Sequence, residues 1–191
     1  MEGQVYKSLW FYTFSEMKLF LVSQKNIPVS IAEVQALYST SVVGVQEHFV
    51  FVKSEKKQYE KLAYTKAVSD VLFVCPKKEL FSFIKKYHWN KTIKNPYCVR
   101  SHFQERSIAA LIWDSLKNPK VSLGHPKTEI HFFFIGKKVY ATKLLWKNTL
   151  QFLERKAQYR PGFYPASLDP QLALAIVNLS GVVSGTIVDP F

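Results

Sequence analysis

The sequence predicts an α+β fold made of two successive units and a short third segment. Three observations predict this organisation. Strand-like and helix-like patterns alternate twice, once before and once after residue 76. Prolines and aromatic residues then interrupt this rhythm over residues 152–169, and positive charge is concentrated in the middle of the chain. Hydrophobic residues make up 48% of the 191 residues, which is enough for packed cores and too many for a disordered chain.

The first unit, residues 1–76, is predicted to be a small α+β domain of ferredoxin-like type. Short apolar runs between polar residues predict four strands, at 8–14, 18–24, 48–54 and 71–75. After Pro28 and Ser30 the apolar residues recur at helical spacing, which predicts a helix carrying Ile31, Val34, Leu37 and Tyr38. The charged stretch at 55–70 is predicted to be helix or loop.

The second unit, residues 77–151, is predicted to be another α+β domain. It starts with a basic helix at 77–89 and a strand at 97–103. A helix at 105–117 follows, with one apolar face formed by Ile108, Leu111, Ile112 and Leu116. Two apolar runs then flank the turn Gly136-Lys137-Lys138, which predicts a hairpin with strands at 129–135 and 139–146.

Residues 152–169 are predicted to be a linker, and residues 170–191 the start of a further domain. A helix at 170–182 is indicated by Asp169 as its N-cap, Pro170 in its first turn and Gly181 after its end. Residues 185–188 predict one strand. One helix and one strand cannot bury a core of their own, so we expect them to belong to a larger domain and residues 183–191 to be poorly anchored.

The charge of the chain is unevenly distributed. Residues 77–160 contain 18 Lys and Arg against 5 Asp and Glu, whereas residues 1–76 carry a net +1 and residues 161–191 a net −2. Such asymmetry indicates a polyanionic partner, either nucleic acid or an anionic membrane; the alternative is a basic surface without a specific partner. The sequence contains no convincing signal peptide and no run of transmembrane length, which favours nucleic acid.

The cations that we expect to contact RNA lie mainly in the second unit and continue into the linker. Their role would be to neutralise phosphates. They are Lys85, Lys86, Lys91, Lys94, Arg100, Arg106, Lys137, Lys138, Lys143, Lys147, Arg155, Lys156 and Arg160. The aromatic residues that could stack on unpaired bases are Tyr87, His88, Trp89 and Trp146, whereas Trp113 and Phe132–Phe134 are expected in the core.

Other chemistry finds no support in the sequence. Cys75 and Cys98 are too few for a disulfide framework and have no metal-ligand spacing, which favours a reduced, cytoplasmic protein. The five histidines are scattered, and no nucleotide-binding glycine motif or nucleophile elbow is present. We therefore assign no catalytic residue and no metal ligand.

Residues 154–191, "ERKAQYRPGFYPASLDPQLALAIVNLSGVVSGTIVDPF", resemble a junction in archaeal tRNA guanine-N2 methyltransferases. In that family an RNA-binding THUMP domain is followed by a Rossmann-like methyltransferase domain. The matching positions are Arg160-Pro161, Pro165, Ser167, Pro170, Leu172-Ala173, Val177-Asn178-Leu179 and Asp189-Pro190-Phe191. The segments "LFLVSQKNIPVSIAEVQAL" and "LAYTKAVSDVLF" resemble the small domain that precedes THUMP, and residues 80–150 resemble THUMP in the order of their elements.

The resemblance implies a function in tRNA methylation. The second unit would be a THUMP-like domain that captures the 3′ CCA end of tRNA, and the parent enzyme would methylate N2 of a guanosine, at position 10. S-adenosylmethionine would be the cofactor, with Pro165, Ser167, Asp189 and Phe191 near it. The family's "CGTGG" loop and its catalytic Pro-Pro-aromatic motif do not occur in this sequence. We therefore expect this chain alone to be inactive and not to bind the cofactor stably.

Three alternatives stay open. The chain could be half of a split enzyme whose catalytic half is another polypeptide, or a stand-alone RNA-binding module. It could also be an interaction scaffold, because relatives can work with a small activator subunit; that subunit is expected to bind the catalytic domain.

Overall fold

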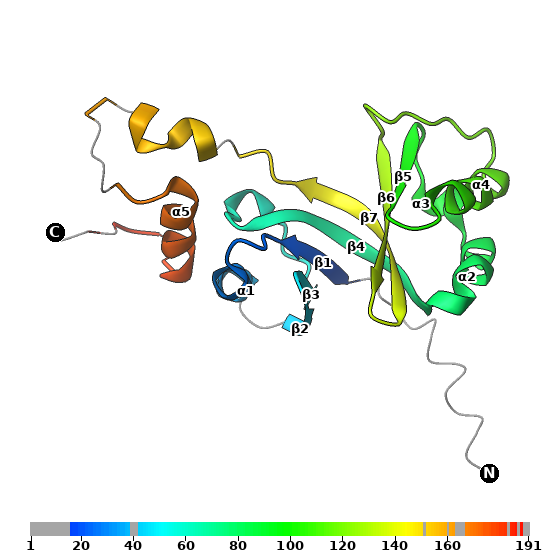
Figure 1. The fold of residues 1–191 in the computed structure, drawn as a ribbon, viewed down its shortest axis with the longest axis horizontal. Coiled ribbons are helices and arrows are strands. Elements are labelled where there is room, and N and C mark those ends of the chain that lie inside the picture. Colours follow the sequence, from blue (N-terminus) through cyan, green and yellow to red (C-terminus); the bar gives the residue numbers. More distant parts are fainter. Residues whose placement is uncertain are drawn as a thin grey trace, which may run out of the picture. The chain divides into compact units, whose positions relative to one another are not determined.

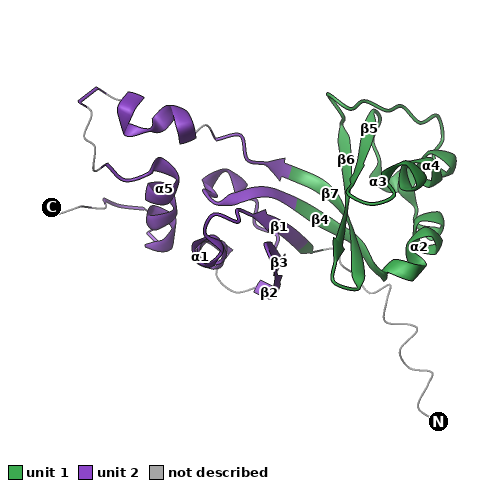
Figure 2. Cartoon of the chain, viewed as in Figure 1, with its two compact units in different colours: residues 1–17, 69–145 green, residues 18–68, 146–191 purple. Residues whose placement is uncertain are grey.

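The computed structural model describes residues 16–38, 42–150, 152–159, 161–162, 167–182, 184–186 and 188. Its contacts divide the chain into two compact units (Figure 2). The central unit comprises residues 1–17 and 69–145, and the split unit comprises residues 18–68 and 146–191. This grouping places the segment from residue 146 onward with residues 18–68. The sequence-based boundaries at 76, 151 and 169 stay a prediction.

In the split unit a small sheet is covered by helices (Figure 1). Its N-terminal part contains β1 (Met17–Val22), α1 (Ile27–Tyr38), β2 (Val42–Gln46) and β3 (Phe49–Lys53), with β2 antiparallel to β3. A 3₁₀ turn (Tyr59–Lys61) leads into β4 (Thr65–Pro76), and α5 (Pro170–Leu179) comes from the C-terminal part. Apolar side chains from α1 and the strands form the core, among them Phe20, Val34, Tyr38, Val50 and Leu62.

In the central unit the strands carry α2 (Leu80–Lys86), α3 (Trp89–Thr92) and α4 (Glu105–Ser115) on one side (Figure 1). Strand β5 (Tyr97–Ser101) is parallel to β6 (Thr128–Ile135), and β6 forms an antiparallel hairpin with β7 (Lys138–Lys147). The core contains Leu80 and Ile84 of α2, Ile108 and Ile112 of α4, and the buried faces of the strands. The hydrogen-bonded strand order is β2-β3-β1-β4-β7-β6-β5, and the predicted α+β class is confirmed.

Most predicted elements are present, with shifted ends. The strand predicted at 71–75 is longer, because β4 begins at Thr65 and includes part of the stretch predicted to be helix or loop. Strand β2 was not predicted; its sequence, Val-Val-Gly-Val-Gln, is short and contains a glycine. The strand predicted at 8–14 lies outside the described residues. Of the strand predicted at 185–188, Gly185, Thr186 and Val188 are described, and none lies in a strand.

The helix predicted at 77–89 was too long. It consists of a 3₁₀ turn (Lys77–Glu79) followed by α2, which ends at Lys86, and the short α3. The indole N–H of Trp89 donates to the carbonyl oxygen of Ile84 at 2.8 Å. In a continuous helix that oxygen would accept from the backbone N–H four residues later. The buried Trp89 side chain therefore takes the place of the next helical hydrogen bond.

Candidate nucleic-acid interface

The central unit contains a cleft of about 310 Å³ between α4, β5 and the segment that follows α4. Ala109, Ala110 and Trp113 line it from α4, together with Glu105 and Arg106 of the first helical turn. Its opposite wall consists of Tyr97, Val99, Val121 and Leu123. Trp113 is 46% exposed and Leu123 is 65% exposed, so large apolar side chains face solvent here.

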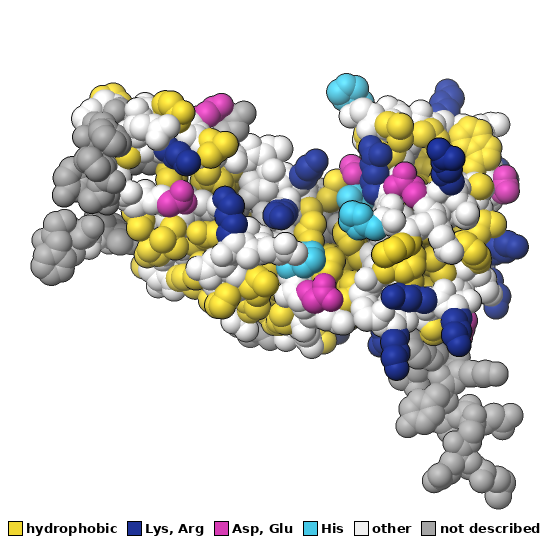
Figure 3. Space-filling model, in the orientation of Figure 1, with side chains coloured by type: hydrophobic (Ala, Val, Ile, Leu, Met, Phe, Trp, Pro, Cys, Tyr) yellow, Lys and Arg dark blue, Asp and Glu magenta, His cyan; other side chains and the backbone are white. Residues whose placement is uncertain are grey.

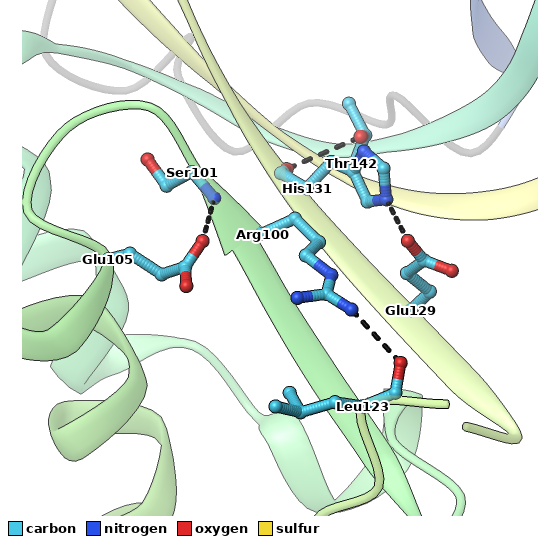
Figure 4. Close-up of polar contacts among 7 residues, drawn as sticks. All are labelled: Arg100, Ser101, Glu105, Leu123, Glu129, His131 and Thr142. Atoms are coloured by element: carbon cyan, nitrogen blue, oxygen red, sulfur yellow. Dashed lines mark hydrogen bonds and ion pairs between the residues drawn. The ribbon is translucent and has the colours of Figure 1, made fainter. Parts of the chain in front are cut away.

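The segment 120–123 is held along the edge of β5 by backbone hydrogen bonds. The Tyr97 N–H donates to the carbonyl oxygen of Lys120 at 2.9 Å, and the Ser122 N–H donates to the carbonyl oxygen of Tyr97 at 3.0 Å. Arg100 then donates from its guanidinium to the carbonyl oxygen of Leu123 at 3.0 Å (Figure 4). These bonds fix the wall formed by Val121 and Leu123 opposite α4.

The turn between β5 and α4 is braced by side chains. The Glu105 carboxylate accepts from the Ser101 N–H at 2.8 Å (Figure 4), and the Ser101 hydroxyl donates to the carbonyl oxygen of Phe103 at 2.7 Å. Gln104 has a positive φ of 54°, so the chain reverses sharply before α4 begins. Glu105 and Arg106, the first two residues of α4, both line the cleft.

Charge distinguishes the central unit. Residues 69–145 contain 14 Lys and Arg against 5 Asp and Glu. Figure 3 shows Lys and Arg side chains around hydrophobic ones over this part of the molecule. Nine of the predicted RNA contacts lie in this unit. Two of them, Arg100 and Lys143, are partly buried. The other seven are exposed: Lys85, Lys86, Lys91, Lys94, Arg106, Lys137 and Lys138.

The remaining predicted cations lie in the split unit. Lys147 and Arg155 are exposed there, Lys156 is partly buried, and Arg160 lies outside the described residues. Arg106 is the predicted cation that lines the cleft, and Arg100 positions its wall. None of these observations tests RNA contact, so the thirteen residues stay a prediction.

The structure corrects the assignment of aromatic residues. Trp89, expected as a stacking residue, is 1% exposed and belongs to the core, whereas Trp113, expected in the core, lines the open cleft. Tyr87 is half-buried, with its hydroxyl 3.0 Å from the Thr92 hydroxyl, and Trp146 packs against the core of the split unit. Of the Phe132–Phe134 run expected in the core, Phe132 is buried, whereas Phe133 and Phe134 are partly buried. His88, expected as a stacking residue, is exposed.

A second helical pattern in α4 could have revealed the cleft. Arg106, Ala109 or Ala110, and Trp113 recur at intervals of three and four residues, so they share one face. The buried residues Ile108 and Ile112 form the other face. Helix α4 therefore has one apolar face against the core and a second face of small residues that leads to Trp113.

In the split unit, the start of α5 is built as the sequence predicts. The Asp169 carboxylate accepts from the N–H groups of Gln171 and Leu172 at 2.9 and 3.2 Å, and Pro170 occupies the first turn. The predicted N-cap is therefore confirmed. Of the four residues expected near a cofactor, Ser167 is described and exposed, and Pro165, Asp189 and Phe191 lie outside the described residues.

A buried carboxylate connects α5 to α1. Glu33 of α1 is completely buried and accepts from the N–H groups of Ala63 and Tyr64 at 2.8 and 2.9 Å. The Asn178 side-chain amide donates to the same carboxylate at 2.6 Å and to the carbonyl oxygen of Lys61 at 2.7 Å. We call Glu33, Asn178 and their backbone partners at 61–64 the Glu33 cluster. Asn178 belongs to the Val-Asn-Leu motif that carries the sequence resemblance.

The described residues offer little for metal or thiol chemistry. No group of three His, Cys, Asp or Glu side chains among them could hold a metal ion. His131 pairs with Glu129 at 2.8 Å (Figure 4). Both cysteines are buried thiols, and burial raises the pKa of Cys75 to about 12. None of the helices in the described ranges combines the length and apolarity that crossing a membrane requires.

Comparison with known proteins confirms the resemblance seen in the sequence. A tRNA (guanine(10)-N2)-dimethyltransferase from the archaeon Methanothermobacter thermautotrophicus is 28% identical to the chain over 193 aligned positions, which cover 91% of this chain and 57% of the relative. The chain resembles the archaeal tRNA guanine-N2 methyltransferases. It spans little more than half the length of this relative. No family model matches the chain.

Solved structures agree on the fold. TrmN from Thermus thermophilus matches with a TM-score of 0.58 and 16% identity, over 85% of this chain and 54% of that one. SMU.472 in complex with SAH matches with a TM-score of 0.54 and 15% identity, over 86% of this chain and 49% of that one. At these identities the likeness concerns the fold alone.

Proposed function

We propose that this chain is the tRNA-binding part of an S-adenosylmethionine-dependent tRNA guanine-N2 methyltransferase acting at guanosine 10. The observation that carries the proposal is the similarity to a tRNA (guanine(10)-N2)-dimethyltransferase over 91% of the chain. The positive charge of residues 69–145 supports it, because a tRNA-binding unit must neutralise phosphates. Within this proposal, the central unit captures the 3′ CCA end, and the enzyme acts in the cytoplasm.

The proposed domains are the N-terminal domain (1–76), the THUMP-like domain (77–151), the linker (152–169) and the start of the methyltransferase domain (170–191). Helix α5 supports the last of these, because its two faces differ. Pro170, Ala175 and Asn178 are buried within the split unit, whereas Ile176 and Val177 are about half exposed. An apolar helix face of this kind is suited to pack against further parts of a domain.

The cofactor proposal rests on fewer described residues. S-adenosylmethionine supplies the methyl group when bound, and SAH, which SMU.472 holds, is what remains after that transfer. Ser167 is exposed two residues before the N-cap of α5. We propose that Pro165, Ser167, Asp189 and Phe191 lie near the cofactor, and that methyl transfer requires the remaining part of such an enzyme. An activator subunit would bind that part.

Binding of tRNA to the purified chain tests the proposal. Fluorescence anisotropy at about 50 and 200 mM salt should show an affinity that falls steeply with salt. Removing the CCA end should weaken binding. An affinity that is unchanged by salt and by the 3′ end would contradict the proposal.

Charge reversal in the two units provides a matched comparison. The double variant Lys85→Glu/Lys86→Glu changes two exposed cations at the end of α2, and Lys25→Glu/Lys57→Glu changes two exposed cations of the split unit by the same total charge. We expect the first pair to weaken binding more and to reduce the salt dependence, by about 0.7 in the slope of log K for each lost single-strand phosphate contact. Equal effects would indicate a non-specific response to net charge.

A further inference from the structure

Three of the exposed apolar residues of the central unit line its cleft, whereas Phe81, Phe103 and Leu145 do not. Trp113, Val121 and Leu123 are each about half exposed or more, and all three line the same space. Ala109 and Ala110 leave one side of the indole without a large neighbour on α4. Exposed apolar side chains that converge on one concave site indicate a place where a ligand excludes water.

The size and charge of the cleft select the kind of ligand. A volume of about 310 Å³ lies at the small end of ligand pockets, which suits one planar ring system. The surrounding unit has an excess of nine positive charges, since 14 Lys and Arg face 5 Asp and Glu over residues 69–145. An apolar cleft with a tryptophan wall in a basic unit complements single-stranded nucleic acid, which combines aromatic bases with anionic phosphates.

Two charged side chains, Glu105 and Arg106, also line the cleft. Arg106 offers guanidinium donors that match a phosphate. Glu105 uses its carboxylate to hold the Ser101 N–H, and a carboxylate can accept several hydrogen bonds at once. A carboxylate accepts from the exocyclic amino groups of adenine, cytosine and guanine, whereas uracil has no such group.

We propose that the cleft between α4 and β5 binds one unpaired RNA base that carries an exocyclic amino group. Trp113 stacks on the base, Arg106 pairs with the adjacent phosphate, and Glu105 accepts a hydrogen bond from the amino group. The proposal rests on the proposed binding of RNA and assigns part of that binding to one cleft. Arg100 is a positioning residue, because it holds the Leu123 wall through its backbone carbonyl.

The test uses the full chain and three fluorescein-labelled hexanucleotides, oligo(A), oligo(C) and oligo(U). We expect oligo(A) and oligo(C) to bind more tightly than oligo(U) and to change the intrinsic fluorescence of the protein. Trp113→Ala should weaken oligo(A) and oligo(C) binding about 5- to 150-fold, the range typical of losing one base–aromatic stack. The matched control Leu153→Ala removes an exposed apolar side chain of the split unit and should leave affinity unchanged.

A second variant guards against a folding defect. Ala110→Leu keeps Trp113 and fills the cleft from an exposed position of α4, so it should block the base without disturbing the core. Glu105→Gln should reduce the preference for oligo(A) and oligo(C) over oligo(U) by about tenfold. The amide oxygen can keep the bond from the Ser101 N–H, and an NH₂ donor then replaces the second acceptor oxygen. Circular dichroism melting curves confirm that each variant is folded.

The outcomes separate this proposal from the proposed function. If Trp113→Ala and Ala110→Leu leave oligonucleotide affinity unchanged while tRNA binding remains salt-dependent, the cleft proposal is wrong and the proposed function stands. A cleft that ignores all three oligonucleotides and instead binds an apolar peptide also overturns it. If the wild-type chain binds neither tRNA nor the oligonucleotides, both proposals fail.

Discussion

The Glu33 cluster and the α4–β5 cleft differ in how a helix contacts its surroundings. In the split unit, buried hydrogen bonds hold α5, and the Glu33 carboxylate accepts three of them. Gln171 adds a further bond from its side-chain amide to the carbonyl oxygen of Ala63 at 2.8 Å. In the central unit, α4 turns an apolar face with Trp113 toward solvent.

The difference separates structural residues from candidate binding residues. A buried carboxylate is stable only when it accepts enough hydrogen bonds. Both oxygens of Glu33 already accept hydrogen bonds from the protein, so the Glu33 cluster holds α5 in place and needs no ligand. An exposed tryptophan contributes less to the folded state than a buried one, and its remaining surface can be covered by a ligand. Mutations in the cluster should therefore change stability, and mutations in the cleft should change binding.

Removing the Glu33 carboxylate should have the largest effect. Glu33→Ala leaves the N–H groups of Ala63 and Tyr64 without their acceptor at a completely buried position, and it removes one of the two acceptors of the Asn178 amide. We expect a loss of about 3–5 kcal/mol in the free energy of unfolding, measured by urea denaturation. Gln35→Ala, on the exposed face of α1, is the matched control and should change it by less than about 0.5 kcal/mol. Similar losses for the two variants would mean that the cluster does not stabilise the unit.

Substitutions of Asn178 should have intermediate effects that depend on charge. Asn178→Ala removes the donor to Glu33 and to the Lys61 carbonyl, and we expect it to cost about 1–3 kcal/mol. Asn178→Asp has nearly the same shape but places a carboxylate against Glu33, so it should cost more than alanine. Amide exchange within α5 should accelerate in both variants. If Asn178→Asp were as stable as the wild type, the cluster would not depend on a donor at this position.

The contrast also explains what the sequence could predict. The end signals of α5 are local, since Asp169 lies two and three residues from the N–H groups that it caps, and that prediction is confirmed. The partners of Glu33 are 30 and 145 residues away in the chain, and no local pattern indicates them. From the sequence alone, a glutamate in the middle of a helix is predicted to be exposed, although Glu33 is completely buried.

The candidate site was predictable in charge and not in shape. Local counting located the excess of Lys and Arg, because charge is a property of composition. The burial of Trp89 depends on where α2 ends. Helix α2 ends where the Trp89 indole donates to the carbonyl oxygen of Ile84. This side-chain contact cannot be predicted from the helical periodicity over 77–89. Strand β4 was underestimated because Lys66 and Asp70 made its first half look like loop.

The buried thiol of Cys75, in the core of the central unit, should have a smaller and pH-dependent effect on the free energy of unfolding. Burial raises the pKa of Cys75 from 9.0 to about 12, with the nearby Glu79 adding to the shift. Between these values the unfolded chain loses the thiol proton and the folded chain keeps it, so the free energy of unfolding falls as pH rises. The stability difference between the wild type and Cys75→Ala should therefore shrink from pH 9 to 11. A difference that is constant over this interval would contradict the shift.

Leu123 should give the smallest effect on stability and the clearest separation of the two regions. Its side chain is 65% exposed, so Leu123→Ala should change the free energy of unfolding by less than about 0.5 kcal/mol. Ile112→Ala, on the buried face of α4, should cost about 2–5 kcal/mol in the same unit. If the cleft binds a base, Leu123→Ala should still weaken oligo(A) binding, by less than Trp113→Ala does, because it removes one wall and leaves the stacking surface. A variant that lost stability and kept its affinity would place Leu123 with the structural residues and remove the distinction between cleft and core.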